Sequence, residues 1–137
     1  MVRMDARMKH EHALGGVETG FTDLDTLCGG LHNSELIILA ARPSMGKTAL
    51  AMNIAEHISI DSHQSVLFVS LEMASLELAD RLLCSAAQVN GHRLRNGTIS
   101  QEDRRRLVQK SSEISSAPLY IDDTPGRTLT EIAAVAR

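Results

Sequence analysis

Hydrophobic residues follow two different patterns along the chain. Residues 36–41 and 66–70 are short, continuous apolar runs, and the first favours a strand buried on both faces, as in a parallel sheet. Between the runs, apolar residues recur at helical spacing, as at Leu50, Ile54 and Ile58. A third strand is expected at 118–122. This alternation predicts a parallel α/β fold with right-handed crossovers.

Capping residues set most of the expected helix boundaries, because a Ser, Thr or Asp side chain can accept a hydrogen bond from the first helical turn. The expected helices are 23–27 after Thr22 with Asp25, 47–59, one capped by Ser75 and extending to about 86, 100–115 opened by Ser100 with Asp103, and one opened by Thr128 with Glu131. Gly29 and Gly30 end the first helix.

Composition places the chain among ordinary folded proteins of one domain. It has 137 residues, of which 43% are hydrophobic and 23% charged, and its formal net charge is −3. No run is long enough to span a membrane, and the N-terminus lacks an apolar export signal, so we expect a cytoplasmic protein. The expected domain is 14–137, and the aperiodic residues 1–13 are expected to be a linker or disordered tail.

The strongest chemical signal is the sequence ARPSMGKT, which fits the phosphate-loop pattern except that its first glycine is replaced by alanine. A strand is expected before it and a helix after it, so backbone N–H groups and a helix N-terminus would face a triphosphate. The alternative is that Gly-Lys-Thr merely opens a helix. The expected strand before the loop and the expected helix after it favour the phosphate loop over this alternative. The candidate nucleotide contacts are Ala41, Arg42, Pro43, Ser44, Met45, Gly46, Lys47 and Thr48.

Acidic residues end the other two expected strands. Glu72 follows the second strand, at the sheet edge where ligands bind in open parallel sheets, and could orient a water that attacks a phosphate. An exposed turn residue is the alternative. Asp122 and Asp123 end the third strand, where a solvated turn is favoured over a metal site. The basic run 104–106 follows two acids and favours a solvated helix face.

Three motifs in this order resemble the replicative DNA helicase family DnaB, in its RecA-like ATPase domain. They are TGFTDLDTLCGGL at 19–31, LIILAARPSMGKT at 36–48 and VSLEM at 69–73, and PLYIDDTPG at 118–126 continues the match. The resemblance covers about residues 14–137. It implies a RecA-like P-loop NTPase, a three-layer α/β fold with a mainly parallel sheet, incomplete at its C-terminus.

The resemblance also implies roles for particular residues. Lys47 becomes the phosphate lysine, Thr48 the Mg²⁺ ligand and Glu72 the catalytic base of an ATP hydrolase. The implied protein is a hexameric helicase that encircles single-stranded DNA and works with a helicase loader and primase. The family's metal-supporting aspartate, DNA loops and trans-acting arginine are expected downstream of residue 137, which implies slow hydrolysis by this chain alone.

Two other functions stay open at this point. A different RecA-like ATPase, such as a recombinase or a clock-type ATPase, would share the phosphate loop but differ in its DNA loops. A nucleotide-binding remnant without catalysis would bind ATP and not turn it over. ATP binding measured together with turnover separates that remnant from an enzyme.

We predict that this chain by itself binds single-stranded DNA weakly or not at all. Its net charge is negative, it has no Trp, one Tyr and two Phe, and its one basic cluster is 104–106. A titration at low salt gives phosphate contacts their best chance. Submicromolar, salt-sensitive binding that disappears when the three arginines are neutralised would contradict the prediction.

Overall fold

The sheet consists of two neighbouring parallel strands in the computed structural model, which describes residues 15–137. β1 (Val66–Val69) pairs with β2 (Leu119–Asp122), and Val66 lies opposite Leu119. The crossover between them carries α4 (Ser75–Ala86), α5 (Gly91–Arg95) and α6 (Gln101–Ser116). The expected parallel α/β arrangement is thus confirmed, whereas the expected tail at 1–13 lies outside the described residues.

The main core lies between three helices and one face of the strands. Met52 from α3 (Lys47–Glu56) packs with Leu78 and Leu82, which are one helical turn apart on α4. Leu78 is completely buried. Side chains from the strands and α6 pack against this cluster, namely Phe68, Leu119, Ile121 and Ile114. Tyr120 alternates to the other strand face and is 62% exposed.

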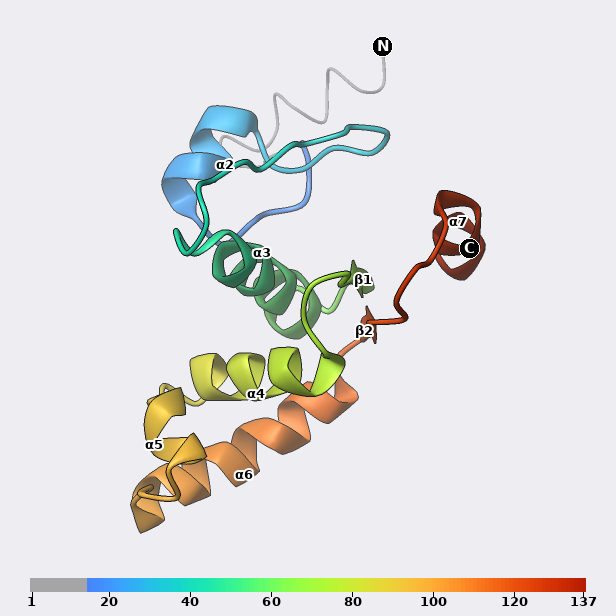
Figure 1. Cartoon of the computed structure of the whole chain (residues 1–137). Coiled ribbons are helices and arrows are strands. Elements are labelled where there is room, and N and C mark those ends of the chain that lie inside the picture. Colours follow the sequence, from blue (N-terminus) through green and yellow to red (C-terminus); the bar gives the residue numbers. More distant parts are fainter. Residues whose placement is uncertain (1–14) are drawn as a thin grey trace.

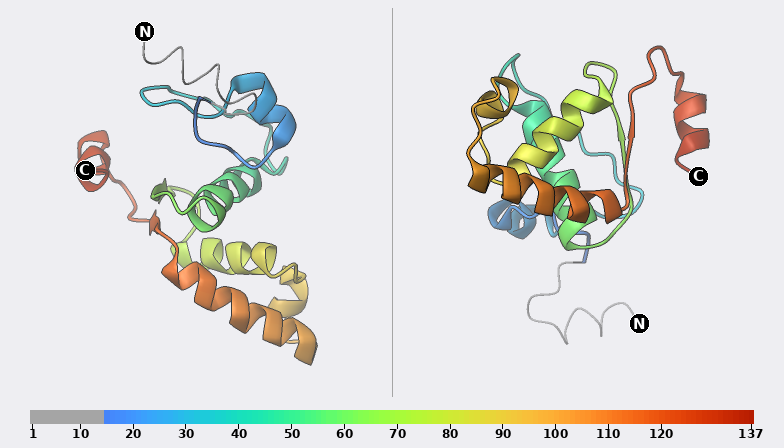
Figure 2. Two further views of the ribbon diagram at one scale, coloured as in Figure 1. Left: turned by 180° about the vertical axis from the view of Figure 1, so that it is seen from behind. Right: turned by 90° about the horizontal axis from the view of Figure 1, so that it is seen from below.

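A second, smaller core was not foreseen from the sequence, because it depends on a short helix without a strong pattern. Ala87, Val89 and Leu107 are buried together under α5 and the start of α6, and partly buried Leu94 packs against them. Asn90 caps α5 by accepting a hydrogen bond from the His92 N–H over 2.9 Å. Figures 1 and 2 show α5 joining the ends of α4 and α6.

The two capping boxes nearest the C-terminus form as expected. Ser100 and Asp103 exchange hydrogen bonds at the start of α6, and Thr128 and Glu131 do so at the start of α7 (Leu129–Val135). The expected Ser75 cap was wrong by one residue, since Ala74 is the N-cap of α4 and supplies no side-chain acceptor. Figure 1 shows α7 standing apart from the other helices.

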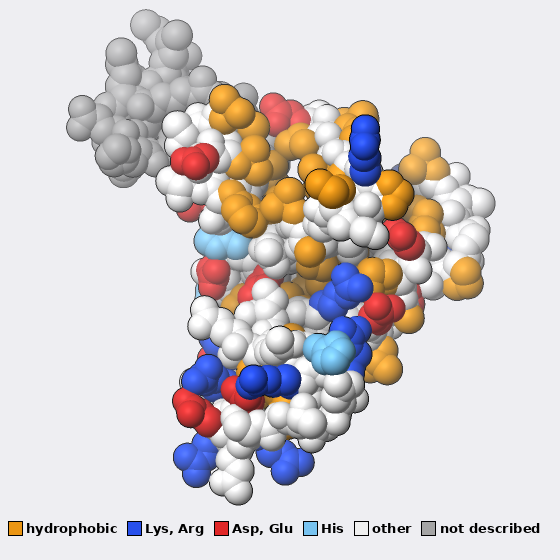
Figure 3. Space-filling view, turned by 60° about the vertical axis from the view of Figure 1, so that its left-hand side comes forward, with side chains coloured by type: hydrophobic (Ala, Val, Ile, Leu, Met, Phe, Trp, Pro, Cys, Tyr) orange, Lys and Arg blue, Asp and Glu red, His pale blue; other side chains and the backbone are white. Residues whose placement is uncertain are grey.

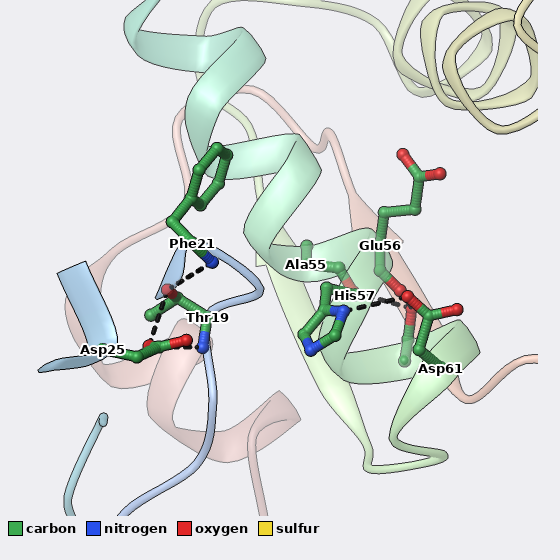
Figure 4. Close-up of polar contacts among 8 residues, drawn as sticks. Thr19, Phe21, Asp25, Ala55, Glu56, His57 and Asp61 are labelled. Atoms are coloured by element: carbon green, nitrogen blue, oxygen red, sulfur yellow. Dashed lines mark hydrogen bonds and ion pairs between the residues drawn. The ribbon is translucent and has the colours of Figure 1, made fainter. Parts of the chain in front are cut away.

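The expected capping pair of Thr22 with Asp25 is also wrong. The helix α2 (Thr22–Cys28) has Phe21 as its N-cap, without a side-chain cap, and ends at Gly29 with φ +73° as expected. Asp25 instead accepts hydrogen bonds from the Thr19 N–H at 2.8 Å and the Thr19 hydroxyl at 2.7 Å. Thr19, which is buried and lies outside α2, thus binds the carboxylate that a capping pair would have used (Figure 4).

The helix expected to reach residue 59 changes its hydrogen bonding before it ends. α3 stops at Glu56 and continues as the π-helical turn η1 (His57–Asp61), in which the ring Nδ1 of His57 lies 2.9 Å from a carboxylate oxygen of Asp61 (Figure 4). Gly20 lies against the His57 ring, so closely that a Cβ there would stand 2.6 Å from the ring carbon. This contact joins the segment before α2 to the end of α3.

The strand expected at Leu36–Ala41 is not formed among the described residues. The segment has no strand assignment, and its side chains are exposed, with Leu36 at 87% and Ile38 at 81%. Hydrophobicity indicated a buried strand, but a strand also needs neighbours for its N–H and C=O groups, and residues 15–137 provide none beside it. Figure 3 shows hydrophobic side chains gathered over this upper part of the molecule.

We predict that Asp25 stabilises the fold in a pH-dependent manner. Burial raises the pKa of Asp25, but hydrogen bonds from Thr19 and the Gly20 N–H outweigh it and leave the pKa below its usual value. The stabilisation is therefore complete above the unfolded pKa of about 3.9 and is lost as pH falls through the lower folded value.

Denaturant unfolding of Asp25→Ala at several pH values tests this. We expect a loss of about 1–3 kcal/mol in unfolding free energy at pH 7, because the Thr19 donors lose their buried acceptor, and a smaller loss at pH 3. Asp23→Ala, on the same helix but exposed, is the control and should cost little. A loss that is equally large at both pH values would contradict an ionised Asp25.

Candidate functional site

The loop that enters α3 is shaped by a tight turn. The Met45 N–H donates to the Arg42 carbonyl over 3.3 Å, and Pro43 and Ser44 are the central residues. Proline fixes a negative φ at the first central position, while Ser44 has φ +63° at the second, which is the arrangement of a type II turn. The proline that the sequence places in the loop thus acts as a stiff entry to it.

Gly46 completes the loop and leaves the start of α3 open. It is the N-cap of α3, with φ +87°, and no side chain caps the first turn of this helix within the described chain. A Cβ added at Gly46 would meet nothing within 4 Å. The first N–H groups of a helix have no partner inside the helix, so an anion could approach them here from an unobstructed side.

A cavity of about 310 Å³ connects this helix start with the end of β1. Lys47 and Thr48 line it from α3, and Glu72 lines it from the turn that follows β1. The other lining residues are Leu39, Ala51, Phe68, Val69, Ser70, Leu71 and Met73. The structure therefore brings together the lysine, threonine and glutamate that the sequence singled out, although they come from segments about 25 residues apart.

The other expected nucleotide contacts are residues 41–46, which come directly before Lys47 in the chain. Residues 41–46 are all exposed, and Met45 is 71% exposed. Ala41 to Met45 do not line the cavity itself. Their assignment as nucleotide contacts stays a prediction from the sequence.

The turn that carries Glu72 is closed by a serine. The Ser70 hydroxyl donates to the Met73 carbonyl over 2.7 Å and accepts from the Met73 N–H at 3.0 Å. Ser70 itself is buried, while Glu72 is exposed at the tip of the turn. The Ser70 side chain thus closes the turn around Glu72 by binding the backbone of Met73, and the Glu72 carboxylate lies at the cavity wall.

The two acids at the end of β2 do more than a solvated turn would. Asp122 accepts from the Thr124 N–H at 3.0 Å and forms an ion pair with Arg127, with 2.8 Å between Oδ2 and Nε. Asp123 accepts from the Ser75 N–H at 2.6 Å, across 48 residues of sequence. The expected turn is present at Asp122, whose side chain binds the N–H two residues on, but Asp123 binds a distant element, which the solvated-turn interpretation did not foresee. Sequence spacing gave no signal of it, because the hydrogen-bond donor lies on another element.

The basic run on α6 lies on a solvated face, as expected. Arg104, Arg105 and Arg106 are exposed, and Arg106 pairs with Glu102 at 2.6 Å. Residues 15–137 contain no group of three or more His, Cys, Asp and Glu side chains that could hold a metal ion by themselves. Both cysteines are free, and no helix of this part of the chain has the length and apolar character needed to cross a membrane.

The parallel strands, the phosphate loop and the helix that follows it define a P-loop ATPase domain of RecA-like fold. Solved structures support this class. One that is described as an ATPase domain superposes with a TM-score of 0.91 at 31% identity, over 99% of this chain and 48% of that one. A DnaB-like replicative helicase, described with its interactions with primase, gives a TM-score of 0.89 at 31% identity, over 99% of this chain and 33% of that one.

The chain belongs to the DnaB-like helicase C-terminal domain family, whose pattern matches residues 16–137. It is 43% identical over 122 residues to the replicative DNA helicase DnaC of Bacillus subtilis, and 44% identical over 134 residues to the replicative DNA helicase DnaB of Treponema pallidum. These matches cover 89% and 98% of this chain, but the chain spans only 27% and 31% of the two relatives.

We predict that Gly46→Ala lowers affinity for ATP, with Gly97→Ala as a matched control. Both glycines have positive φ and open space where a Cβ would stand, so each substitution should cost about 1–2 kcal/mol of stability. Gly97 lies between α5 and α6, away from the loop. Calorimetric titration with ATP should show a loss for Gly46→Ala alone, and an equal loss in both variants would contradict the assignment.

Proposed function

We propose that this chain is the ATP-binding portion of a replicative DNA helicase, which couples ATP hydrolysis to DNA unwinding in replication. The observation that carries the proposal is the cavity shared by Lys47, Thr48 and Glu72. A phosphate-binding lysine, a hydroxyl suited to Mg²⁺ and a carboxylate suited to a water are the groups that phosphoryl transfer to water requires. The family membership favours the helicase over a recombinase or a clock-type ATPase.

The loop and the start of α3 fit the triphosphate. Uncapped N–H groups at a helix N-terminus attract anions, and the open side of Gly46 leaves room for phosphate oxygens near the backbone. Lys47 is the first residue of α3, and its ammonium group would neutralise the β- and γ-phosphates. Residues 41–48 would thus bind ATP mainly through their backbone and Lys47 through its charge.

Thr48 is the residue that would hold Mg²⁺, through its hydroxyl. Mg²⁺ keeps several waters and binds phosphate oxygens, so one protein ligand from the loop is enough to place it. This fits a cavity that has Thr48 in its wall. Bound there, the ion would withdraw charge from the phosphates.

Glu72 would act on the attacking water. An ionised carboxylate orients a water by accepting its hydrogen bond and can take its proton as the bond to phosphorus forms. Glu72 lines the same cavity as Lys47 and Thr48, which would give it access to such a water. The lysine would then hold the phosphates before and during the reaction, whereas the glutamate would contribute only during it.

The partners follow from the family and belong to this proposal. We infer a cytoplasmic protein that assembles into a hexameric ring around single-stranded DNA and is placed there by a helicase loader. A related helicase structure is described with its interactions with primase, and we extend that partner to this protein. The DNA contacts would lie outside the described residues, and of the exposed basic run on α6 Arg106 is already paired with Glu102.

Two substitutions test the division of roles. We expect Lys47→Ala to abolish ATP binding. Glu72→Gln should bind ATP nearly as well as the unchanged protein, while hydrolysis by the assembled ring that we propose falls by about a hundredfold or more. Binding is measured by calorimetry, and hydrolysis by phosphate release in a single turnover with protein in excess. Glu77→Gln, an exposed glutamate on α4 that does not line this cavity, is the control for Glu72.

Normal hydrolysis by Glu72→Gln would show that Glu72 is an exposed turn residue without a catalytic role. Tight ATP binding without any effect of Glu72→Gln on a measurable rate would favour a nucleotide-binding protein without this catalytic group. Retention of ATP binding by Lys47→Ala would contradict the assignment of the phosphate site to the start of α3.

A further inference from the structure

The turn that carries Glu72 is bound at one end to the last residue of β2 and at the other end to the residue that follows β2. Before the turn, the Ser70 N–H donates to the Asp122 carbonyl over 2.8 Å and extends the strand pairing by one bond. After the turn, the Ser75 N–H donates to the Asp123 carboxylate over 2.6 Å. The four residues between these bonds, 71–74, are therefore held between Asp122, the last residue of β2, and Asp123, the residue that follows the strand.

The second tie replaces a cap that α4 lacks. The N-cap residue Ala74 has no side-chain acceptor, so the N-terminal N–H groups of α4 must find partners elsewhere. Asp123 supplies a charged acceptor from a different element. Hydrogen bonds from the backbone and hydroxyl of Ser75 lower the pKa of Asp123, which keeps the carboxylate ionised at neutral pH.

Asp123 is held in place by the residue before it. Asp122 is part of the strand pairing, because it lies opposite Val69, and its side chain binds the Thr124 N–H and Arg127. These contacts fix the backbone on both sides of Asp123. A carboxylate on a fixed strand end can define the position of the helix start that it binds, whereas one on a free loop could not.

We propose that Asp123 is a positioning residue for Glu72, acting through the Ser75 N–H to hold the Glu72 turn at the mouth of the cavity. This inference rests on the proposed role of Glu72 in ATP hydrolysis. Asp123 does not line the cavity, so its effect passes through the backbone of residues 71–75. Asp123 would therefore affect the position of Glu72 rather than the charge in the cavity. A misplacement of about 1 Å at a catalytic group can cost up to a hundredfold in rate.

Amide hydrogen exchange on the 137-residue chain tests the tie directly. In Asp123→Ala the Ser75 amide should exchange at least about tenfold faster, and the Met73 amide should follow, because opening of the α4 start is then easier. Asp123→Asn keeps a side-chain oxygen acceptor and should restore most of the protection. Ser100→Ala, which removes the cap of α6 far from the cavity, is the matched control and should leave these amides unchanged.

Single-turnover phosphate release by the assembled ring that we propose tests the catalytic consequence. We expect Asp123→Ala to slow hydrolysis about tenfold while its affinity for ATP changes by less than about twofold, and Asp123→Asn to recover most of the rate. In a chain that already carries Glu72→Gln, Asp123→Ala should have no further effect on the rate. Two residues that act through one group are not additive.

The outcomes separate this inference from the proposed function. If Glu72→Gln is slow but Asp123→Ala hydrolyses ATP at the normal rate, or if the Ser75 amide is equally protected in Asp123→Ala, the positioning role is wrong and the role of Glu72 stands. If Glu72→Gln hydrolyses ATP normally, the proposed function of Glu72 fails first. An equal slowing by Ser100→Ala would show a general loss of stability rather than positioning.

Discussion

The parallel pairing of β1 and β2 is the constraint on which the described structure depends. Parallel strands need a crossover, and the helices α4, α5 and α6 supply it between residues 75 and 116. The same register brings Val69 opposite Asp122, so both strands end at one edge. The turn with Glu72 and the acids of β2 meet there because of this register, and the main core covers one face of the same two strands.

Two helix N-termini lie near this edge, and the structure treats them differently. The start of α4 has no side-chain cap of its own, and its Ser75 N–H donates to the carboxylate of Asp123. The start of α3 also lacks a side-chain cap, but Gly46 leaves it open. The N-terminus of α4 is thus bonded within the protein, whereas the N-terminus of α3 remains available to an anion. The proposed positioning of Glu72 and the proposed binding of phosphate therefore use different helices.

Features that depend on neighbouring residues were predictable from the sequence, and features that depend on distant residues were not. The capping boxes of Ser100 and Thr128 use partners three residues away and formed as expected. Ser75 and Asp25 carry similar signals, but their actual partners, Asp123 and Thr19, lie on other segments. Lys47, Thr48 and Glu72 were singled out because the phosphate-loop spacing is local and Glu72 directly follows a strand, whereas the other lining residues of the cavity carry no such signal.

The unpaired segment Leu36–Ala41 bears directly on the binding site, because it leads into the phosphate loop. Hydrophobicity alone predicted a buried strand, yet Leu36 and Ile38 are exposed and no strand flanks them within residues 15–137. A loop entered from an unpaired segment keeps more conformational freedom than one entered from a sheet. The triphosphate that we propose for this loop would therefore have to offset the cost of ordering residues 36–41, in addition to desolvating Lys47. The turn at residues 42–45 is already closed by the bond from the Met45 N–H to the Arg42 carbonyl, so the ordering cost would fall on the segment before it rather than on the loop.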